Sequence, residues 1–366
     1  MNFAKRMLAL MLAVMMVFAL TGCSNTLADD TDVVATYDDL SMNGILYTRF
    51  LLDAYTLADT YKDDPAADVL DTTVEGIPAA EWIQNTAYAD VERYFTCLEK
   101  FEKSDMEFTD EDQAYVDDYA ANMLEQYSFL YGPFGIDLQS LKDYYSYNIK
   151  SMALFDYYYG KGGEKEVPEE EIKAKLADTY NLTKVMIFDK ALPTADADGN
   201  LVEPSAEEVA AAEAKARSYY DRAVAGEDFE QLIIEWESDL FAGQDIGHTH
   251  EEEGSHDLIT QIGGSSVPVA YSSVMDAAPF GEPQFIEDSD VYYVATRYDI
   301  AEDQVQLESY RSTILLTLRS EDFRVMTEEW MQEVDVTFND AVIEKYSPEW
   351  IAKAMNKLGL TNNMAQ

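Results

Sequence analysis

The chain has 366 residues, of which 71 are acidic and 25 are basic, so its formal net charge is −46 at pH 7. A surface this acidic argues against binding to nucleic acid or to other polyanions. The apolar fraction of 47% is enough to build real cores and excludes wholesale disorder, and the length suggests about two domains.

The first 22 residues have the pattern of a secretory signal peptide. A short basic start precedes an apolar run, residues 7–20, that is too short to span a bilayer comfortably. The run ends in LTGC, which resembles the lipobox of bacterial lipoproteins and implies cleavage before Cys23 and a diacylglyceryl group on its sulfur. Two or more acyl chains hold a protein firmly to a membrane. We therefore expect a lipid anchor on the extracytoplasmic face of the cell membrane, followed by a polar tether over residues 23–32. An ordinary signal peptide with a stray cysteine is the alternative.

The part of the chain after the tether is predicted to be mainly helical. Residues 32–42 hold strand-forming residues broken by a pair of aspartates, which predicts a short hairpin. Apolar residues then recur at three- and four-residue spacing to about residue 160, as in amphipathic helices. We assign residues 33–165 to an N-terminal helical domain. Cys97 lies in one of these helices and is predicted to be a buried hydrophobe, because an acylated Cys23 leaves it no disulfide partner.

A second kind of pattern follows a polar, glycine-rich stretch at residues 160–171, which we interpret as a domain junction. A strand at 183–190 is followed by two helices, an irregular stretch and a strand at 290–300. This order predicts a small α+β module, residues 178–301, embedded in a helical protein. Helical periodicity then returns and leads to a short strand and a terminal helix, so residues 302–366 are predicted to rejoin the first domain.

The order of these parts resembles the PrsA and SurA extracytoplasmic foldases, whose isomerase domains are of the parvulin type. VPEEEIKAKLADTYNLTKVMIF, residues 167–188, is similar to the lead-in helix and first strand of a parvulin domain. EAKARSYYDRAVAGEDFEQLIIEWESD, residues 213–239, is similar to its two helices, and AGQDIG, residues 242–247, to a glycine-rich loop of the family. The resemblance implies an α+β protein in which both chain ends form a mainly helical chaperone domain that carries an inserted parvulin-like domain.

The chemistry implied by the resemblance is rotation about X-Pro bonds, which face a barrier of about 20 kcal/mol. A catalyst supplies an apolar seat for the proline ring and polar groups that favour the twisted amide. Parvulins typically carry two histidines for this purpose. Their positions fall here at about Val185 and Tyr292, so both histidines are missing and isomerase activity is expected to be weak or absent.

The apolar seat is better preserved in the sequence than the polar groups. The resemblance places Tyr271 at an aromatic position of the proline pocket, with Met275 and Phe280 as further lining. Val267 replaces a usual methionine. The alternative is that Tyr271, Met275 and Phe280 are simply core residues.

All histidines of the chain, His248, His250 and His256, lie in the stretch GHTHEEEGSH. Imidazole suits zinc, and a nearby glutamate could complete four ligands. The stretch is also rich in glycine and glutamate, which favours a solvated loop, and the resemblance implies that this loop lies at the rim of the parvulin cleft. We expect no dedicated cofactor, with weak zinc binding at these histidines as the alternative.

Together these patterns favour a membrane-anchored foldase or chaperone for exported proteins, whose parvulin-like domain binds proline-containing segments. The first alternative is an active parvulin-type peptidyl-prolyl cis-trans isomerase, and the second is an anchored metal- or solute-binding lipoprotein. The expected partners are unfolded or folding exported polypeptides and the membrane, and no nucleic acid; the oligomeric state is left open. The tyrosines at 144–145 and 157–159 are either faces for unfolded clients or core residues.

Overall fold

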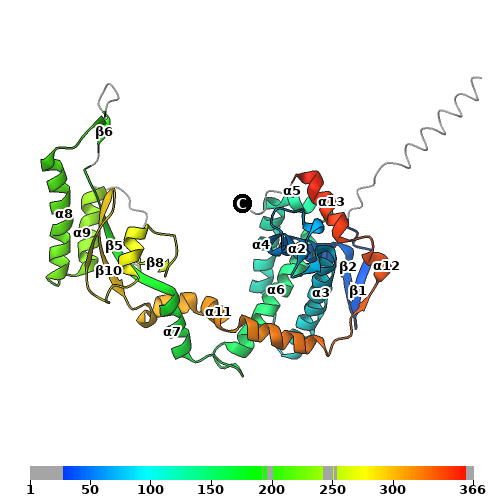
Figure 1. Cartoon of the computed structure of the whole chain (residues 1–366). Coiled ribbons are helices and arrows are strands. Elements are labelled where there is room, and N and C mark those ends of the chain that lie inside the picture. Colours follow the sequence, from blue (N-terminus) through cyan, green and yellow to red (C-terminus); the bar gives the residue numbers. More distant parts are fainter. Residues whose placement is uncertain (1–27, 192, 196–200, 242–249, 251–253, 360–366) are drawn as a thin grey trace, which may run out of the picture. The chain divides into compact units, whose positions relative to one another are not determined.

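The computed structural model describes residues 28–191, 193–195, 201–241, 250 and 254–359 (Figure 1). Within these residues, no helix is both long and apolar enough to cross a membrane. The chain divides into two compact units. Unit 1 comprises Met1–Tyr158 and Glu321–Gln366, and unit 2 comprises Tyr159–Ser320. The predicted class is confirmed: this is a mainly helical α+β protein in which both chain ends belong to one unit.

The first unit boundary lies beside the polar stretch 160–171 that the sequence marks as a junction, and the second lies farther along the chain than the predicted border at 301–302. One boundary lies at the end of α6 (Leu138–Tyr159), and the other lies within α11 (Gln304–Met331). The predicted module, residues 178–301, is therefore shorter at both ends than unit 2. Because α11 continues through the second boundary, its helical pattern has no break there and the sequence carries no signal of that boundary.

Unit 1 is built mostly from helices that enclose one apolar core. Its core side chains come mainly from α2, α3, α6 and α13, and Cys97 on α3 is fully buried there, as predicted. Burial raises the pKa of the Cys97 thiol to about 11. The helices besides α6 and the last part of α11 are α2 (Gly44–Tyr61), α3 (Ala79–Lys103), α4 (Asp110–Gln126), α5 (Ser128–Tyr131), α12 (Asp340–Ile343) and α13 (Pro348–Leu358), with short turns η1 (Val69–Asp71) and η2 (Gly132–Phe134) and the strand pair β3 (Thr73–Val74) and β4 (Ile77–Pro78).

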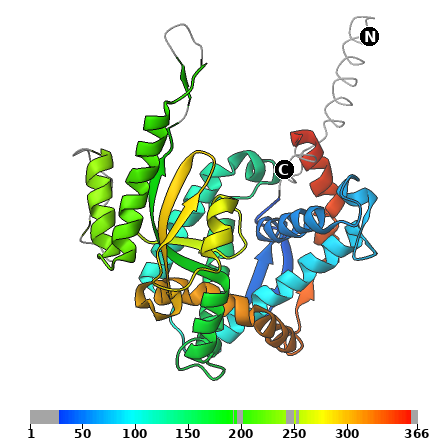
Figure 2. The same cartoon turned by 60° about the vertical axis from the view of Figure 1, so that its left-hand side comes forward.

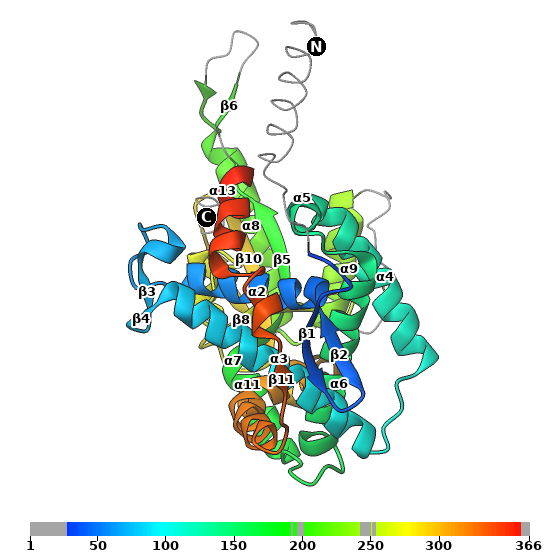
Figure 3. The same cartoon turned by 90° about the vertical axis from the view of Figure 1, so that its right-hand side faces the viewer.

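A small sheet joins the two ends of the chain within unit 1. It has the order β11-β1-β2, with β1 (Val33–Tyr37) between β2 (Leu40–Asn43) and β11 (Thr337–Phe338), and Figure 3 shows the three strands side by side. The predicted hairpin and the return of the C-terminal strand are thus both present. Pairing of Ala35 with Phe338 brings residues about 300 positions apart into one ladder.

The start of α2 is fixed by a close approach of the two chain ends. The Asn43 side chain caps the helix by accepting the N–H of Leu46 at 2.8 Å. The next residue, Gly44, has room for no side chain, because a Cβ there would lie 2.7 Å from the phenolic oxygen of Tyr346. Glycine is therefore required at this point for packing against the C-terminal segment.

Unit 2 is centred on an antiparallel sheet of order β8-β5-β10-β9 (Figure 2). Helices α8 and α9 cover one face of the sheet, and the short helix α10 covers the other. The strands are β5 (Tyr180–Asp189), β8 (Leu258–Gln261), β9 (Gln284–Glu287) and β10 (Val291–Tyr298); the helices are α8 (Ala206–Val224), α9 (Phe229–Phe241) and α10 (Val269–Met275), and β6 (Thr194–Ala195) pairs with β7 (Leu201–Val202).

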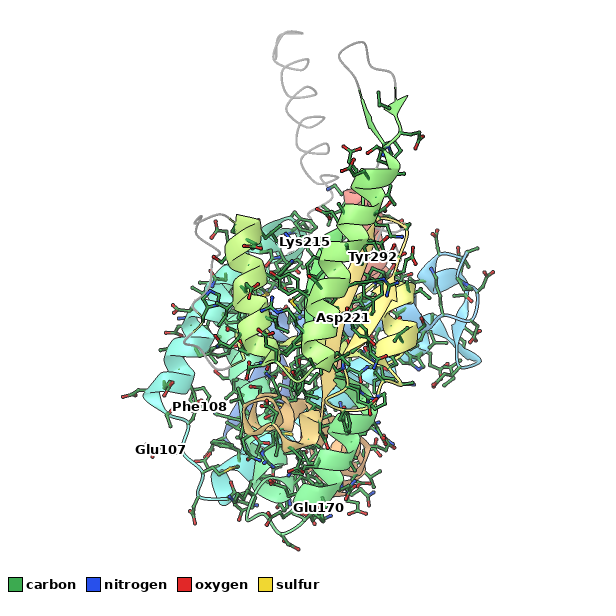
Figure 4. All side chains as sticks on the ribbon, turned by 90° about the vertical axis from the view of Figure 1, so that its left-hand side faces the viewer. Glu107, Phe108, Glu170, Lys215, Asp221 and Tyr292 are labelled. Atoms are coloured by element: carbon green, nitrogen blue, oxygen red, sulfur yellow. The ribbon has the colours of Figure 1, made fainter. Side chains whose placement is uncertain are left out.

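The two faces of this sheet carry separate cores, because successive side chains of a strand point to opposite sides. On β10, Tyr292 and Val294 pack with α8 and α9, whereas Tyr293 and Ala295 pack with α10. Figure 4 shows α8, marked by the exposed Lys215 and Asp221, in front of the sheet, with Tyr292 labelled on β10.

Helix α7 (Glu169–Thr179), the turn η3 (Ile300–Glu302) and the first part of α11 complete unit 2. Arg319 of α11 donates to both oxygens of Glu171 on α7, at 2.7 and 2.8 Å. The rings of Tyr180 and Tyr310 lie 4.7 Å apart. These contacts attach both helices to the sheet.

Candidate functional sites

Some predicted site residues lie outside the described part of the chain. These are Cys23, His248 and the loop 242–247 that resembles a family motif. The other predicted residues lie in unit 2, on β5, on β10, around α10 and beside α9.

The two positions predicted for the missing family histidines lie on opposite faces of the sheet. Val185 on β5 pairs with Ala295 and packs on the α10 face, whereas Tyr292 pairs with Phe188 and packs under α8 and α9. Side chains at Val185 and Tyr292 therefore point to opposite faces of the sheet. A slip of one residue along a strand moves a side chain to the other face. Tyr293 is the neighbouring β10 residue that shares the α10 face with Val185.

The predicted proline pocket is occupied by its own side chains. Tyr271 is 2% exposed and Met275 is 1% exposed. The Tyr271 hydroxyl donates to Oγ1 of Thr183 at 2.8 Å, and its ring meets Tyr293 edge-on at 5.2 Å. Burial raises the pKa of Tyr271 to about 12. Thus Tyr271 and Met275 are core residues of the α10 face, and in this structure they offer almost no surface to a proline ring.

The other two predicted pocket residues have different surroundings. Val267 is half-buried at the edge of the same core. Phe280 is 51% exposed, and the guanidinium of Arg297 lies 4.8 Å from its ring centroid. The structure therefore brings Val267, Tyr271 and Met275 together, but it leaves Phe280 at the surface.

Two residues of the histidine stretch, His250 and His256, contact helix α9, which the sequence did not connect with them. The His256 side chain is 4% exposed, and its Nε2 lies 3.1 Å from Oε2 of Glu237. Nδ1 of His250 lies 3.6 Å from the same Glu237 oxygen, and the two imidazole rings are 5.3 Å apart. Among the described residues, His250, His256 and Glu237 form a group whose ligand atoms all lie within 4.8 Å of one another.

A second glutamate of α9 lies on the other side of His256. Nδ1 of His256 contacts Oε1 of Glu230, and Nζ of Lys184 donates to the other oxygen of Glu230 at 2.5 Å. Burial raises the pKa of Glu230, but the hydrogen bonds from Lys184 and His256 outweigh it and hold that pKa below its usual value.

Neither glutamate was predicted as a site residue, although α9 was predicted as a helix. The available signal was the position of Glu237 in the helical period. Phe229, Leu232 and Ile233 form the buried stripe of α9, and Glu237 continues this stripe and is 7% exposed. A carboxylate on the buried face of a helix needs a partner.

Unit 1 has a distinct feature, which we call the aromatic ridge: Tyr115 and Tyr119 of α4 with Tyr145 of α6. These helices run side by side in Figures 1 and 3. The rings of Tyr115 and Tyr119 are stacked at 5.7 Å, and Tyr119 meets Tyr145 edge-on at 4.8 Å. Tyr115 is 56% exposed and Tyr119 is 37% exposed. The ridge thus presents aromatic faces to solvent.

The ridge is supported by packed groups beneath it. Tyr145 contacts Tyr144, whose ring lies 5.3 Å from that of the core residue Phe50. The guanidinium of Arg49 lies 4.4 Å from the Tyr144 centroid, and the Tyr144 hydroxyl donates to Asp53 at 2.8 Å. Tyr144 and Tyr145 are therefore half-buried, part core and part surface, between the two alternatives that the sequence left open.

The exposure of the ridge follows from the composition of α4. This helix buries fully only Val116 and Ala120, which are one turn apart. Tyr115 and Tyr119 have the same spacing but lie beside this narrow stripe, so their rings cover little of the core. A capping box of Thr109 and Asp112 starts α4.

Comparison with known proteins gives distant structural similarities. The chain matches no family model and no curated protein. It is similar to a solved structure of the foldase protein PrsA from Lactococcus lactis, with 14% identity, a TM-score of 0.35, and coverage of 90% of this chain and 99% of that one. Foldase protein PrsA from Streptococcus pneumoniae has 17% identity and a TM-score of 0.29, covering 69% and 89%. PrsA from Bacillus subtilis has 15% identity and a TM-score of 0.26, covering 78% and 90%.

Proposed function

We propose that this protein is a membrane-anchored extracytoplasmic foldase or chaperone that holds exported polypeptides on unit 1, with weak or absent isomerase activity in unit 2. The observation that supports this most is the aromatic ridge. Contiguous exposed apolar surface on a soluble domain marks an interaction site. Here the exposed side chains are tyrosines, which combine apolar area with a polar tip.

The ridge suits unfolded chains better than one folded partner. Aromatic faces bind apolar and aromatic side chains without a fixed hydrogen-bond pattern, so they can bind chains of many different sequences. Unfolded chains expose such side chains along their length. Tyr145 packs on Tyr144, and Tyr144 in turn packs on Phe50, so little side-chain entropy is lost on binding. The formal charge of −46 keeps a loaded protein soluble and keeps copies apart.

The weak isomerase activity follows from what lies on the α10 face. Val185 and Tyr293 stand there without an imidazole, and Tyr271 fills the apolar seat with its own ring. An X-Pro amide has no polar group at these positions to favour its twisted state. Unit 2 would then bind proline-containing segments weakly or only after rearrangement.

The proposed location rests on the sequence of the signal and lipobox. Cys23 in LTGC would carry the acyl chains, and residues 23–32 would act as a tether. Replacement of Cys23 by Ala should move the protein from the membrane fraction to the soluble fraction. Complete retention of that variant in membranes would show that the anchor is not at Cys23.

The function is tested with the mature chain carrying Cys23→Ser, so that it is soluble without lipid. A denatured client is diluted into buffer with and without the protein, and aggregation is followed by light scattering. Rotation about an X-Pro bond is measured separately with a tetrapeptide. We expect the protein to suppress aggregation when it is present in near-equal molar amounts to the client. We expect it to cause almost no acceleration of X-Pro isomerisation in the tetrapeptide. Strong peptide isomerisation without any suppression would contradict the proposal.

A further inference from the structure

We propose that His250, His256 and Glu237 form a zinc site in unit 2. This inference is independent of the chaperone function, because it concerns residues on the α9 face and not the aromatic ridge. The three side chains come from α9 and from the stretch that precedes β8, so a bound ion would link that stretch to the helix.

The spacing of the ligand atoms fits one small ion. In tetrahedral zinc sites nitrogen and oxygen ligands lie about 2.0–2.2 Å from the metal, which places two ligand atoms about 3.3–3.6 Å apart. Nε2 of His256 lies 3.1 Å from Oε2 of Glu237, and Nδ1 of His250 lies 3.6 Å from the same oxygen. Small side-chain adjustments are enough to place all three atoms around one ion.

The surroundings of His256 match those of a metal-binding histidine. Such histidines usually donate the other ring N–H to a carboxylate, which fixes the tautomer and orients the ring. Nδ1 of His256 contacts Glu230, and Lys184 donates to the second oxygen of Glu230. This contact turns Nε2 toward Glu237. A nitrogen lone pair and a carboxylate oxygen 3.1 Å apart repel one another unless a proton or a metal ion lies between them.

The second histidine completes a ligand set typical of zinc. Two imidazoles and one carboxylate have their ligand atoms within 4.8 Å of one another, and both histidines approach the same oxygen of Glu237. Calcium and magnesium prefer sites made of oxygen atoms, so they should not compete.

Two of the three proposed ligand side chains are buried, which distinguishes the site from the many acidic side chains at the surface. The side chains of His256 and Glu237 are 4% and 9% exposed, so an ion held there is removed from most of the solvent. Three protein ligands leave a fourth position for water or another group. The predicted consequence is a zinc ion that stabilises the contacts of His250 and His256 with α9.

The test is zinc binding by the Cys23→Ser chain, freed of metal with a chelator and titrated in high salt against a competing chelator. We expect one tightly bound equivalent, not displaced by excess calcium, and a tetrahedral visible spectrum when cobalt replaces zinc. Glu237→Gln, His256→Ala and His250→Ala should each remove this binding. Glu230→Gln should weaken it roughly 10- to 100-fold, as expected for a residue that orients a ligand.

The matched control is Glu235→Gln, the same substitution two residues away on the exposed side of α9, which should leave binding unchanged. Circular dichroism of each variant separates lost ligands from lost folding. His250 is 34% exposed and can be replaced without opening the core. If a variant at the buried side chain of His256 or Glu237 fails to fold, zinc binding by His250→Ala therefore still tests the proposed site. The proposal is overturned if the parent chain holds no zinc, if cobalt stays octahedral, or if His250→Ala and Glu235→Gln bind equally well.

Discussion

The hydroxyl of Tyr346 donates a hydrogen bond of 2.7 Å to a carboxylate oxygen of Asp32, 314 positions earlier in the chain. The same phenolic oxygen accepts the N–H of Asp29 at 3.1 Å, and Lys345 forms an ion pair with Asp32 at 2.8 Å. Tyr346 is fully buried, and its ring rests where Gly44 has no side chain. These contacts couple the start of unit 1 to the end of the chain, so neither end is expected to be stable without the other.

Replacement of Tyr346 by Phe tests this coupling. The variant loses the bond to Asp32 and leaves the Asp29 N–H without its partner, while the ring stays in place. We expect a loss of about 1–2 kcal/mol in the free energy of unfolding, in the lower part of the range for a hydrogen bond to a charged group because Lys345 also neutralises Asp32. Denaturant unfolding followed by circular dichroism measures it. Tyr61→Phe, at a tyrosine that is 62% exposed, is the control, and equal midpoints for the two variants would refute the coupling.

The extent of unit 2 can be tested with two fragments. Residues 159–320 keep α7 and the first part of α11, with the Arg319–Glu171 pair and the Tyr180–Tyr310 contact. Residues 178–301, the module predicted from the sequence, lack all of these. We expect the longer fragment to unfold cooperatively at a clearly higher denaturant concentration, because buried Leu176 and Leu307 are retained only there. Equal midpoints would mean that the shorter module is the complete folding unit.

Substitutions at Tyr271 test whether this residue is part of the core or lines a binding pocket. Because it is 2% exposed, Tyr271→Ala should lower the stability of unit 2 by about 3–5 kcal/mol, as for other large aromatic truncations in cores. Tyr271→Phe should cost about 1 kcal/mol through the lost bond to Thr183. Thermal unfolding and binding of a proline-containing peptide are measured together. Peptide binding that falls in Tyr271→Phe, with stability unchanged, would indicate an open pocket instead.

Several features of the fold could be predicted from local patterns. The hairpin at 32–42, the cap at Thr109 and the return of the C-terminal strand depend on strand alternation, capping residues and periodicity, all of which are visible in one sequence. The class followed from the same patterns. The boundary within α11 could not, since that helix continues through it, whereas the boundary at the end of α6 lies beside the polar stretch 160–171 that marks a junction in the sequence.

The candidate sites were less accessible to sequence reasoning, because they depend on tertiary contacts. Tyr292 and Val185 lie on opposite faces of the sheet, and the sequence alone does not show this because one strand position is enough to change the face. The partners of His256 lie 19 and 26 residues earlier, on α9, and no spacing rule links them to it. Only the place of Glu237 in an otherwise apolar stripe marked the helix as unusual.

The central claim is that the aromatic ridge holds unfolded chains, and the most direct measurement is aggregation suppression by a variant that lacks it. Tyr115→Ser with Tyr119→Ser removes two exposed rings from α4 while leaving buried Val116 and Ala120 in place, so folding should be retained. Tyr61→Ser, at an exposed tyrosine outside the ridge, is the matched control.

We expect the double variant to need roughly ten times more protein for equal suppression of light scattering, corresponding to loss of a modest aromatic binding energy. The Tyr61→Ser control should match the parent chain, and circular dichroism should be the same for all three. Full suppression by the double variant, at the parent's concentration, would contradict the account and place client binding elsewhere on the protein.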